Sequence, residues 1–195
     1  HLENARLRQT RIEERLIGRS ISMRELHQRL RVLVNLEVDL LIAGETGTGK
    51  ELAARVLHDL SARATFPFVA INCGALNEAE VDRELFGASD APGLIARAEG
   101  GTLYLDELES MPDSLQVRLL RVVEAREITP LGAAPRPIDL RILGSVKQPP
   151  EQLVADGRLR ADLFHRFNAG ALLLPPLRER EDDALLLVGH FAAEA

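Results

Sequence analysis

A glycine-rich segment that ends in a lysine is the first feature of this chain that could do chemistry. Residues 44–50 read Gly-Glu-Thr-Gly-Thr-Gly-Lys, which matches the pattern G-x-x-x-x-G-K. Glycines let backbone amides curl around phosphate oxygens, and the lysine reaches the terminal phosphates. The segment predicts a phosphate site, and a chance glycine loop is the alternative. The candidate binding residues are Gly44, Glu45, Thr46, Gly47, Thr48, Gly49, Lys50 and Glu51.

Two adjacent carboxylates follow an apolar run further along the chain. Residues 101–107 read GTLYLDE, so Asp106 and Glu107 stand at the carboxyl end of a predicted strand, in the pattern of a Walker B element. One such carboxylate can hold Mg²⁺ while its neighbour orients a water molecule. We assign Asp106 and Glu107 to the metal and Glu107 also to catalysis. The alternative is a capping pair that opens the next segment.

Predicted strands and helices alternate around these motifs. Short apolar runs predict strands, and apolar residues at helical spacing predict helices between them. Such alternation predicts βαβ units, and hence an α/β fold with a parallel sheet covered by helices on both faces. The strands are expected at 36–43, 66–72, 102–105, 138–146 and 169–174, and the helices at 23–34, 50–60, 78–86 and from Asp113 onward.

The N-terminal segment is expected to form a separate linker helix over residues 1–16. Its few apolar residues are Leu2, Ala5, Ile12 and Leu16, which fall at heptad-like spacing. Two interpretations stay open, namely a solvated linker helix and a dimerising coiled coil. The chain begins with His, and we expect it to be a segment of a longer protein.

Composition limits the remaining function classes. The chain has 195 residues, 46% of them hydrophobic, with a net charge of -6 and no apolar stretch of membrane-spanning length. We therefore expect a cytoplasmic protein, and the single Cys73 excludes an internal disulfide framework. The net charge is negative outside residues 1–35, so DNA is expected to be bound only by domains outside this chain. Only two of the 24 basic residues are lysines, Lys50 and Lys147.

Several longer segments together resemble one family, the AAA+ domain of NtrC-type bacterial enhancer-binding proteins, which activate sigma-54 RNA polymerase. The resemblance is nearest to the C4-dicarboxylate transport regulator branch, through LLRVVEAREITPLG at 119–132. It implies a P-loop NTPase core over residues 17–178 and the start of a helical lid at 179–195. Glu51 after the lysine is expected in this family. The other matching segments are GETGTGKE at 44–51, FVAINCGAL at 68–76, ELFG at 84–87, GGTLYLDE at 100–107 and PPLRER at 175–180.

The resemblance also implies how the chain handles nucleotide. It places Leu16, Ile17 and Gly18 near the adenine of ATP or ADP, with Mg²⁺ as the metal. Asn72 matches the family's asparagine that holds the glutamate equivalent to Glu107 in check. The alternative for Asn72 is a strand-end residue that satisfies backbone groups.

Three basic residues receive roles from the same resemblance. Arg160 and Arg166 align with arginine fingers that reach the γ-phosphate of a neighbouring subunit in a ring, either a hexamer or a heptamer. The alternative for both is a surface ion pair. Lys147 falls at the sensor I position, where it either senses the γ-phosphate or is simply solvated. His58 and His165 lack partners at metal-ligand spacing, so no zinc site is expected.

The segment between Gly87 and Gly100 departs from the family. Relatives carry a longer loop there, with the motif G-A-F-T-G-A that touches sigma-54, whereas this chain has only residues 88–99, in which Pro92-Gly93 predicts a tight turn. The leading hypothesis is an ATP-binding and ATP-hydrolysing domain of a response-regulator type transcriptional regulator that does not remodel the sigma-54 holoenzyme by the usual contact. The alternative is a non-hydrolysing scaffold whose nucleotide-gated assembly regulates transcription with another sigma factor. An AAA+ protein of another branch, a chelatase or a helicase loader, is disfavoured by FVAINCGAL and PPLRER.

Overall fold

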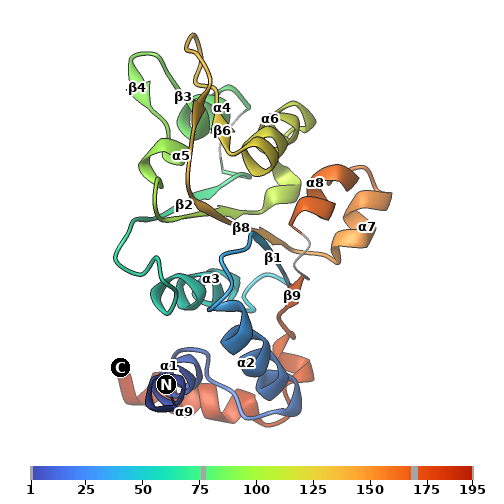
Figure 1. The fold of residues 1–195 in the computed structure, drawn as a ribbon. Helices are drawn as coiled ribbons and strands as arrows, with labels where there is room; N and C mark the ends of the chain where they lie inside the picture. Colours follow the sequence, from blue (N-terminus) through green and yellow to red (C-terminus); the bar gives the residue numbers. More distant parts are fainter. Residues whose placement is uncertain (1, 76–77, 168–170, 195) are drawn as a thin grey trace.

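A five-stranded parallel sheet forms the centre of the molecule (Figure 1). The computed structural model describes residues 2–75, 78–167 and 171–194. The strands lie in the order β2-β5-β8-β1-β9, and every neighbouring pair is parallel, which confirms the predicted α/β fold class. The strand bounds are β1 Leu40–Ala43, β2 Phe68–Asn72, β5 Thr102–Asp106, β8 Arg141–Val146 and β9 Leu172–Leu173.

Alternating side chains of β1 supply both faces of the sheet. Leu41 and Ala43 belong to one buried cluster, and Leu40 and Ile42 to the other. Because successive strand residues point to opposite faces, a run that is apolar throughout needs cover on both sides. Helices α4 Glu78–Phe86, α5 Leu94–Arg97, α6 Asp113–Ala125, α7 Pro150–Ala155 and α8 Ala161–Arg166 cover one face; α1 Leu2–Arg15, α2 Ile21–Leu33 and α3 Lys50–Asp59 cover the other.

The N-terminal helix α1 docks on the core through its C-terminal end. Ile12 is fully buried and Leu16 nearly so, in one cluster with residues of α2 and α3. The expectation of a solvated linker helix is therefore wrong for this half of α1, since its apolar spacing is satisfied within the chain. At the other end of the described chain, α9 runs from Asp183 to Glu194. None of the described helices is long and apolar enough to cross a membrane.

β1, β2 and β8 begin later than their apolar runs predict, at Leu40, Phe68 and Arg141. Asp39, the residue before β1, ties that strand to the start of β8. The Asp39 carboxylate accepts the Ile142 N–H at 2.8 Å and a guanidinium N–H of Arg126 at 2.7 Å. Of the predicted strand 169–174, Leu172–Leu173 pairs with β1, while residues 169 and 170 lie outside the described residues.

The short segment after α4 is a hairpin. Strands β3 Gly87–Ala88 and β4 Ala91–Pro92 are antiparallel, with Gly87 opposite Pro92. The predicted turn at Pro92-Gly93 is therefore wrong, because the chain reverses at residues 89–90 and Gly93 precedes α5. Glycine is required at 93 because its backbone touches that of Gly87: a Cβ on Gly93 would lie 2.4 Å from the Gly87 nitrogen.

Replacing Gly93 with alanine tests this close approach. The added methyl group would also meet the Leu85 carbonyl oxygen at 2.5 Å, so the hairpin or α4 must shift. We expect Gly93→Ala to lower the free energy of unfolding by about 2–3 kcal/mol, the usual cost of overpacking against backbone. Urea denaturation measures the change.

Gly189 in α9 provides the matched control. A Cβ there meets nothing within 4 Å. Gly189→Ala is expected to leave stability unchanged or raise it by up to about 1 kcal/mol, through helix propensity. Equal stability of the two variants would contradict the close approach at Gly93.

Candidate functional site

The glycine-rich loop connects β1 to α3 and wraps around its own lysine. Gly47 and Gly49 have φ angles of 82° and 96°, the left-handed region that glycine adopts without strain. The Lys50 side chain is buried, and its Nζ donates to the carbonyl oxygens of Gly44 at 2.8 Å and Glu45 at 3.0 Å. Burial lowers the pKa of Lys50, and the nearby carboxylates only partly oppose this effect. An ammonium group thus lies inside the loop, where phosphate oxygens would need it.

Asp106 lies at the carboxyl end of β5 and is held by three neutral side chains. Its Oδ1 accepts from the Tyr104 hydroxyl at 3.0 Å and closely from the Ser145 hydroxyl, and its Oδ2 accepts from the Asn72 amide at 3.4 Å. None of these partners neutralises the carboxylate. Asp106 is therefore held in a fixed position at the end of β5.

Glu107 turns out of the strand through an unusual backbone conformation. Its φ of 56° and ψ of 51° are rare for a residue with a Cβ, and such angles concentrate at functional sites. Its Oε1 lies 2.7 Å from the Nζ of Lys147. Lys147 is the main cause that lowers the pKa of Glu107; burial opposes it, and the Asn72 amide assists. Glu107 is therefore held chiefly by a lysine.

Asn72 lies where the resemblance implies, at the end of β2 and beside both carboxylates. Besides its contact with Asp106, its Oδ1 accepts the N–H of Gly74 at 2.8 Å, so it also satisfies a backbone group. Its role as a switch on Glu107 stays a prediction.

The loop and the carboxylates line one cavity of about 470 Å³. This cavity unites two motifs that are more than fifty residues apart in the sequence. Mg²⁺ is commonly bound through one or two carboxylates together with phosphate oxygens and water, which fits Asp106 beside a phosphate loop. Within the described ranges, no cluster of three or more His, Cys, Asp or Glu could hold a metal alone. The lining residues are Thr46, Gly47, Gly49, Lys50, Glu51, Leu52, Arg55, Tyr104, Asp106, Glu107 and Lys147.

The segment predicted to contact adenine passes beside the loop. A Cβ on Gly49 would lie 4.0 Å from a methyl carbon of Leu16, and the Leu16 carbonyl is 2.7 Å from His27 Nε2. Gly18 is packed against Asp183 at the start of α9, whose carboxylate accepts the N–H groups of Arg19 at 2.6 Å and Ser20 at 3.2 Å. The adenine role of Leu16, Ile17 and Gly18 stays a prediction.

Two arginines that sequence reasoning left without a role hold the glycine-rich loop. Arg180 is buried, and its guanidinium donates to the Thr48 carbonyl at 2.8 Å and the Pro175 carbonyl at 2.8 Å. Arg178 is exposed and forms two hydrogen bonds with Glu45, at 2.6 and 2.7 Å, which lower the pKa of Glu45. Both arginines lie in PPLRER at 175–180, one of the segments that indicated the family. The sequence therefore did mark these two residues, although it did not indicate what they contact.

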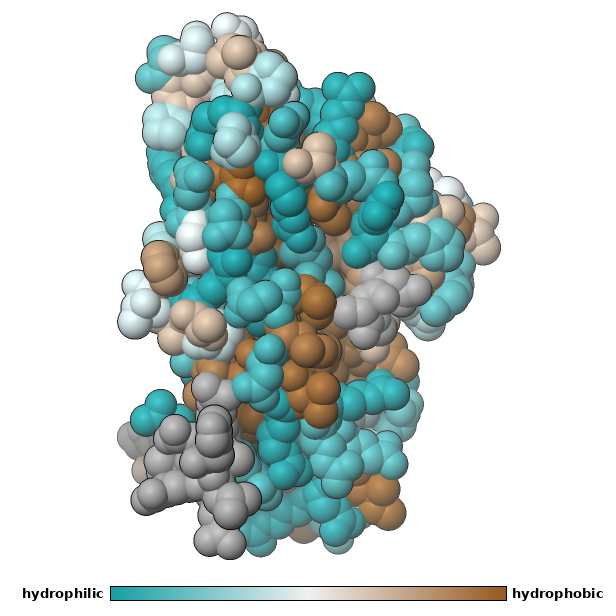
Figure 2. All heavy atoms as spheres, viewed as in Figure 1, coloured by the Kyte–Doolittle hydropathy of each residue, from teal (hydrophilic) through white to brown (hydrophobic). Residues whose placement is uncertain are grey.

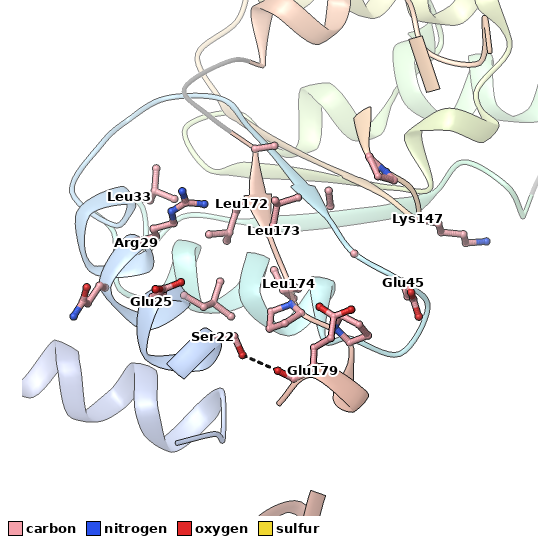
Figure 3. A pocket seen from close by; sticks show the side chains of 18 of the residues that line it. Ser22, Glu25, Arg29, Leu33, Glu45, Lys147, Leu172, Leu173, Leu174 and Glu179 are labelled. Carbon is pink, nitrogen blue, oxygen red and sulfur yellow. Dashed lines mark hydrogen bonds between the residues drawn. The ribbon is translucent and has the colours of Figure 1, made fainter. Parts of the chain in front are cut away.

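A larger, mostly apolar groove of about 1120 Å³ lies on the other side of Gly44 and Glu45, between α2 and β9 (Figure 3). Hydrophobic side chains gather in the hollow between these elements (Figure 2). Lys147 borders both this groove and the smaller cavity, and its side chain extends away from α2 (Figure 3). The groove's apolar lining includes Leu26, Val32, Leu33, Leu36, Leu172, Leu173 and Leu174.

The two predicted arginine fingers lie outside the cavity, at the two ends of α8. Arg160 binds Asp113 at 3.1 Å and Asp162 at 2.9 Å, and Arg166 binds Glu124 at 2.6 Å. Hydrogen bonds to Asp162, and then Asp113, raise the pKa of Arg160. The surface ion pairs named as the alternative are thus present. Exposed pairs of this kind are weak enough to exchange for another anion.

A model of the sigma-54 interaction domain family matches residues 16–172. The chain belongs to this family. The C4-dicarboxylate transport transcriptional regulatory protein DctD of Rhizobium meliloti is 48% identical over an alignment 190 residues long, which covers 92% of this chain and 41% of that protein. DctD of Pseudomonas aeruginosa is 46% identical over an alignment 206 residues long, which covers 98% of this chain and 45% of that protein. The chain spans less than half the length of these curated relatives.

Solved structures agree with this assignment to the sigma-54 interaction domain family. NtrX from Brucella abortus in complex with ATP matches with a TM-score of 0.87 and 36% identity, over 92% of this chain and 41% of that one. The P-loop NTPase domain of a sigma-54 transport activator from E. coli matches with a TM-score of 0.60 and 27% identity, over 83% of this chain and 99% of that one. The P-loop NTPase fold and the resemblance to NtrC-type activators are confirmed.

Arg180 and Arg178 form a matched pair that tests how this domain holds its glycine-rich loop. Arg180→Met removes two hydrogen bonds from a buried guanidinium and leaves the Thr48 carbonyl without that donor. We expect it to lower the free energy of unfolding by about 2–3 kcal/mol. Arg178→Met removes an exposed ion pair and should change stability little. Urea denaturation measures both, and an Arg178 variant that is the less stable of the two would contradict the assignment.

Proposed function

We propose that this chain binds ATP with Mg²⁺ and hydrolyses it between subunits of a ring, as the AAA+ domain of a bacterial transcriptional regulator. The observation that carries the proposal is the single cavity in which Lys50 and the glycine-rich loop face Asp106 and Glu107. A phosphate cradle alone would support binding only. The carboxylate that turns out of β5 beside the cradle supports hydrolysis as well.

Each residue of the site has a proposed role that follows from its chemistry. The backbone of Gly44, Glu45, Thr46, Gly47, Thr48 and Gly49 cradles the phosphates, and Lys50 binds the terminal ones. When bound at Asp106, Mg²⁺ neutralises phosphate charge. Glu107 orients a water molecule and accepts its proton as the water oxygen bonds to the γ-phosphorus. The bond from that phosphorus to the bridging oxygen then breaks, which leaves ADP and phosphate.

Arg160 and Arg166 act on the nucleotide of a neighbouring subunit. Both guanidinium groups are partly exposed and lie outside their own chain's cavity, with side chains 33% and 57% accessible. They stabilise the charge that builds up on the transferred phosphoryl group, which raises hydrolysis by about 10³ to 10⁵ in other NTPases. Hydrolysis therefore requires assembly, and a hexamer or heptamer supplies one finger-bearing neighbour to each site.

Mixing inactive variants tests hydrolysis between subunits. Lys50→Ala destroys its own phosphate site and keeps the arginines, whereas Arg160→Ala keeps its site and loses a finger. We expect each variant alone to be inactive and a mixture of the two to recover part of the ATPase activity. Steady-state phosphate release, measured across protein concentration, gives the readout.

A second mixture serves as the control. Lys50→Ala and Glu107→Gln both damage the chain's own site, so their mixture should stay inactive. Tight nucleotide binding without turnover at any concentration of the unchanged protein would contradict hydrolysis and support the non-hydrolysing scaffold.

We further propose that the short β3-β4 hairpin leaves the chain without the usual sigma-54 contact. The hairpin reverses at residues 89–90, and its ends are fixed by the contact of Gly87 with Gly93. On its other side, Gly87 and Ser89 form backbone hydrogen bonds with Leu131, both at 3.0 Å. These bonds support a short hairpin in place of a long loop, and we infer that the domain regulates transcription through another sigma factor or through its own assembly.

Open-complex formation at a sigma-54 promoter tests this second proposal. We expect the chain to form none, and we expect a variant with G-A-F-T-G-A inserted between Ser89 and Asp90 to gain binding to sigma-54. Permanganate footprinting detects the open complex, and sedimentation with sigma-54 detects binding. Robust open complexes formed by the unchanged chain would overturn the proposal.

A further inference from the structure

The two oxygens of the Asp106 carboxylate have different surroundings. Oδ1 accepts hydrogen bonds from two hydroxyl groups, that of Tyr104 at 3.0 Å and that of Ser145. Oδ2 has a longer contact, at 3.4 Å from the Asn72 amide. A carboxylate oxygen has two lone pairs, so two hydroxyl donors fill the hydrogen-bonding capacity of Oδ1. Oδ2 is therefore the oxygen with capacity left for a cation.

The sheet fixes both hydroxyl groups in place. Tyr104 and Asp106 are two residues apart on β5, so their side chains point to the same face of the sheet. The parallel pairing of β5 with β8 brings Ser145 beside Asp106. Both donors are buried, and the Tyr104 ring is stacked on that of Phe68 with centroids 6.2 Å apart. Rotation of the Asp106 carboxylate would therefore break these hydrogen bonds.

Divalent cations differ in how they use a carboxylate. Mg²⁺ is small and requires near-ideal octahedral geometry, into which the narrow bite of a bidentate carboxylate fits poorly. Ca²⁺ is larger, accepts more oxygen ligands in a flexible geometry, and commonly uses both oxygens of one carboxylate. A carboxylate with one oxygen already occupied therefore suits Mg²⁺ and penalises Ca²⁺.

We propose that Tyr104 and Ser145 are positioning residues that make the nucleotide site select Mg²⁺ over Ca²⁺. Their hydroxyl groups occupy Oδ1 of Asp106, so that a cation binds through Oδ2 alone. The proposal rests on the nucleotide site proposed above, with Asp106 as its metal ligand. It gives a role to the phenol of the only tyrosine in the chain, which lines the same cavity as Asp106.

A purely structural role for the two hydroxyl groups has different consequences. They would then donate to Asp106 only because buried hydroxyl groups need acceptors, and their loss would weaken the binding of every metal equally. Ser145 also accepts the Glu107 N–H at 3.2 Å, so its loss affects the turn after β5 as well. Tyr104→Phe is thus the sharper variant, because it removes one hydroxyl group and keeps the stacked ring.

Calorimetry with β,γ-imido ATP tests the proposal without any hydrolysis. The 195-residue chain is titrated with the analogue in Mg²⁺, in Ca²⁺ and in EDTA, and the ratio of the Ca²⁺ to the Mg²⁺ dissociation constant measures selectivity. Tyr104→Phe should lower this ratio about fivefold, because the carboxylate loses one hydrogen bond and Ca²⁺ gains access to Oδ1. The affinity in EDTA should not change, which also shows that the variant is folded.

Ser61→Ala is the matched control. Ser61 is buried just beyond the end of α3, and its hydroxyl donates to the His58 carbonyl at 2.7 Å. Losing this buried hydroxyl should leave the selectivity ratio unchanged, whereas Ser145→Ala should lower the ratio as Tyr104→Phe does. Equal weakening of Mg²⁺ and Ca²⁺ complexes by Tyr104→Phe would overturn this inference alone. Failure of the unchanged chain to bind the analogue would overturn the proposed function, and the inference with it.

Discussion

The parallel register of β1, β5 and β8 is the constraint on which the rest of the structure depends. Ala43 lies opposite Val146, and Leu105 lies opposite Gly144, so the carboxyl ends of three strands meet at one edge of the sheet. The glycine-rich loop leaves β1 there, Asp106 ends β5 there, and Lys147 follows β8 there. A shift of one residue in any of these pairings would turn its side chains to the opposite face.

Charge is concentrated at this edge, and the surrounding residues keep it ordered. Lys50 is enclosed by carbonyl oxygens of its own loop, Asp106 by hydroxyl and amide donors, and Glu107 by Lys147. Only the last of these contacts pairs opposite charges, and it is also the most exposed. Lys50 and Asp106 are therefore held by neutral groups, whereas Glu107 is held by an exposed ion pair.

Much of this site was predictable from the sequence because its motifs are local. The glycine-rich loop and the Asp106-Glu107 pair each follow an apolar run, and parallel strands bring such carboxyl ends together. Ser145 could have been found in the same way, since the register that joins Leu105 to Gly144 brings the next residues together. The contacts of Arg180 with Thr48 and of Asp183 with Ser20 join segments more than a hundred residues apart, and no spacing rule indicates them.

The remaining errors arose where local patterns compete with tertiary contacts. Pro92-Gly93 is a good turn sequence, yet the backbone contact between Gly87 and Gly93 places both residues in the stem of the hairpin. Residues 1–16 look like a solvated helix, yet Ile12 and Leu16 bury themselves against α2 and α3. In both cases the local sequence favours one conformation, a turn or an exposed helix. Packing against other parts of the chain selects a different one.

The central claim is that the cavity between the glycine-rich loop and the end of β5 is a nucleotide site, and direct binding tests it most simply. Titration calorimetry with Mg²⁺ and a slowly hydrolysed ATP analogue should show saturable binding of one nucleotide per chain. Lys50→Ala should abolish it, because the buried ammonium at the centre of the loop is lost. Undiminished binding by Lys50→Ala would contradict the account.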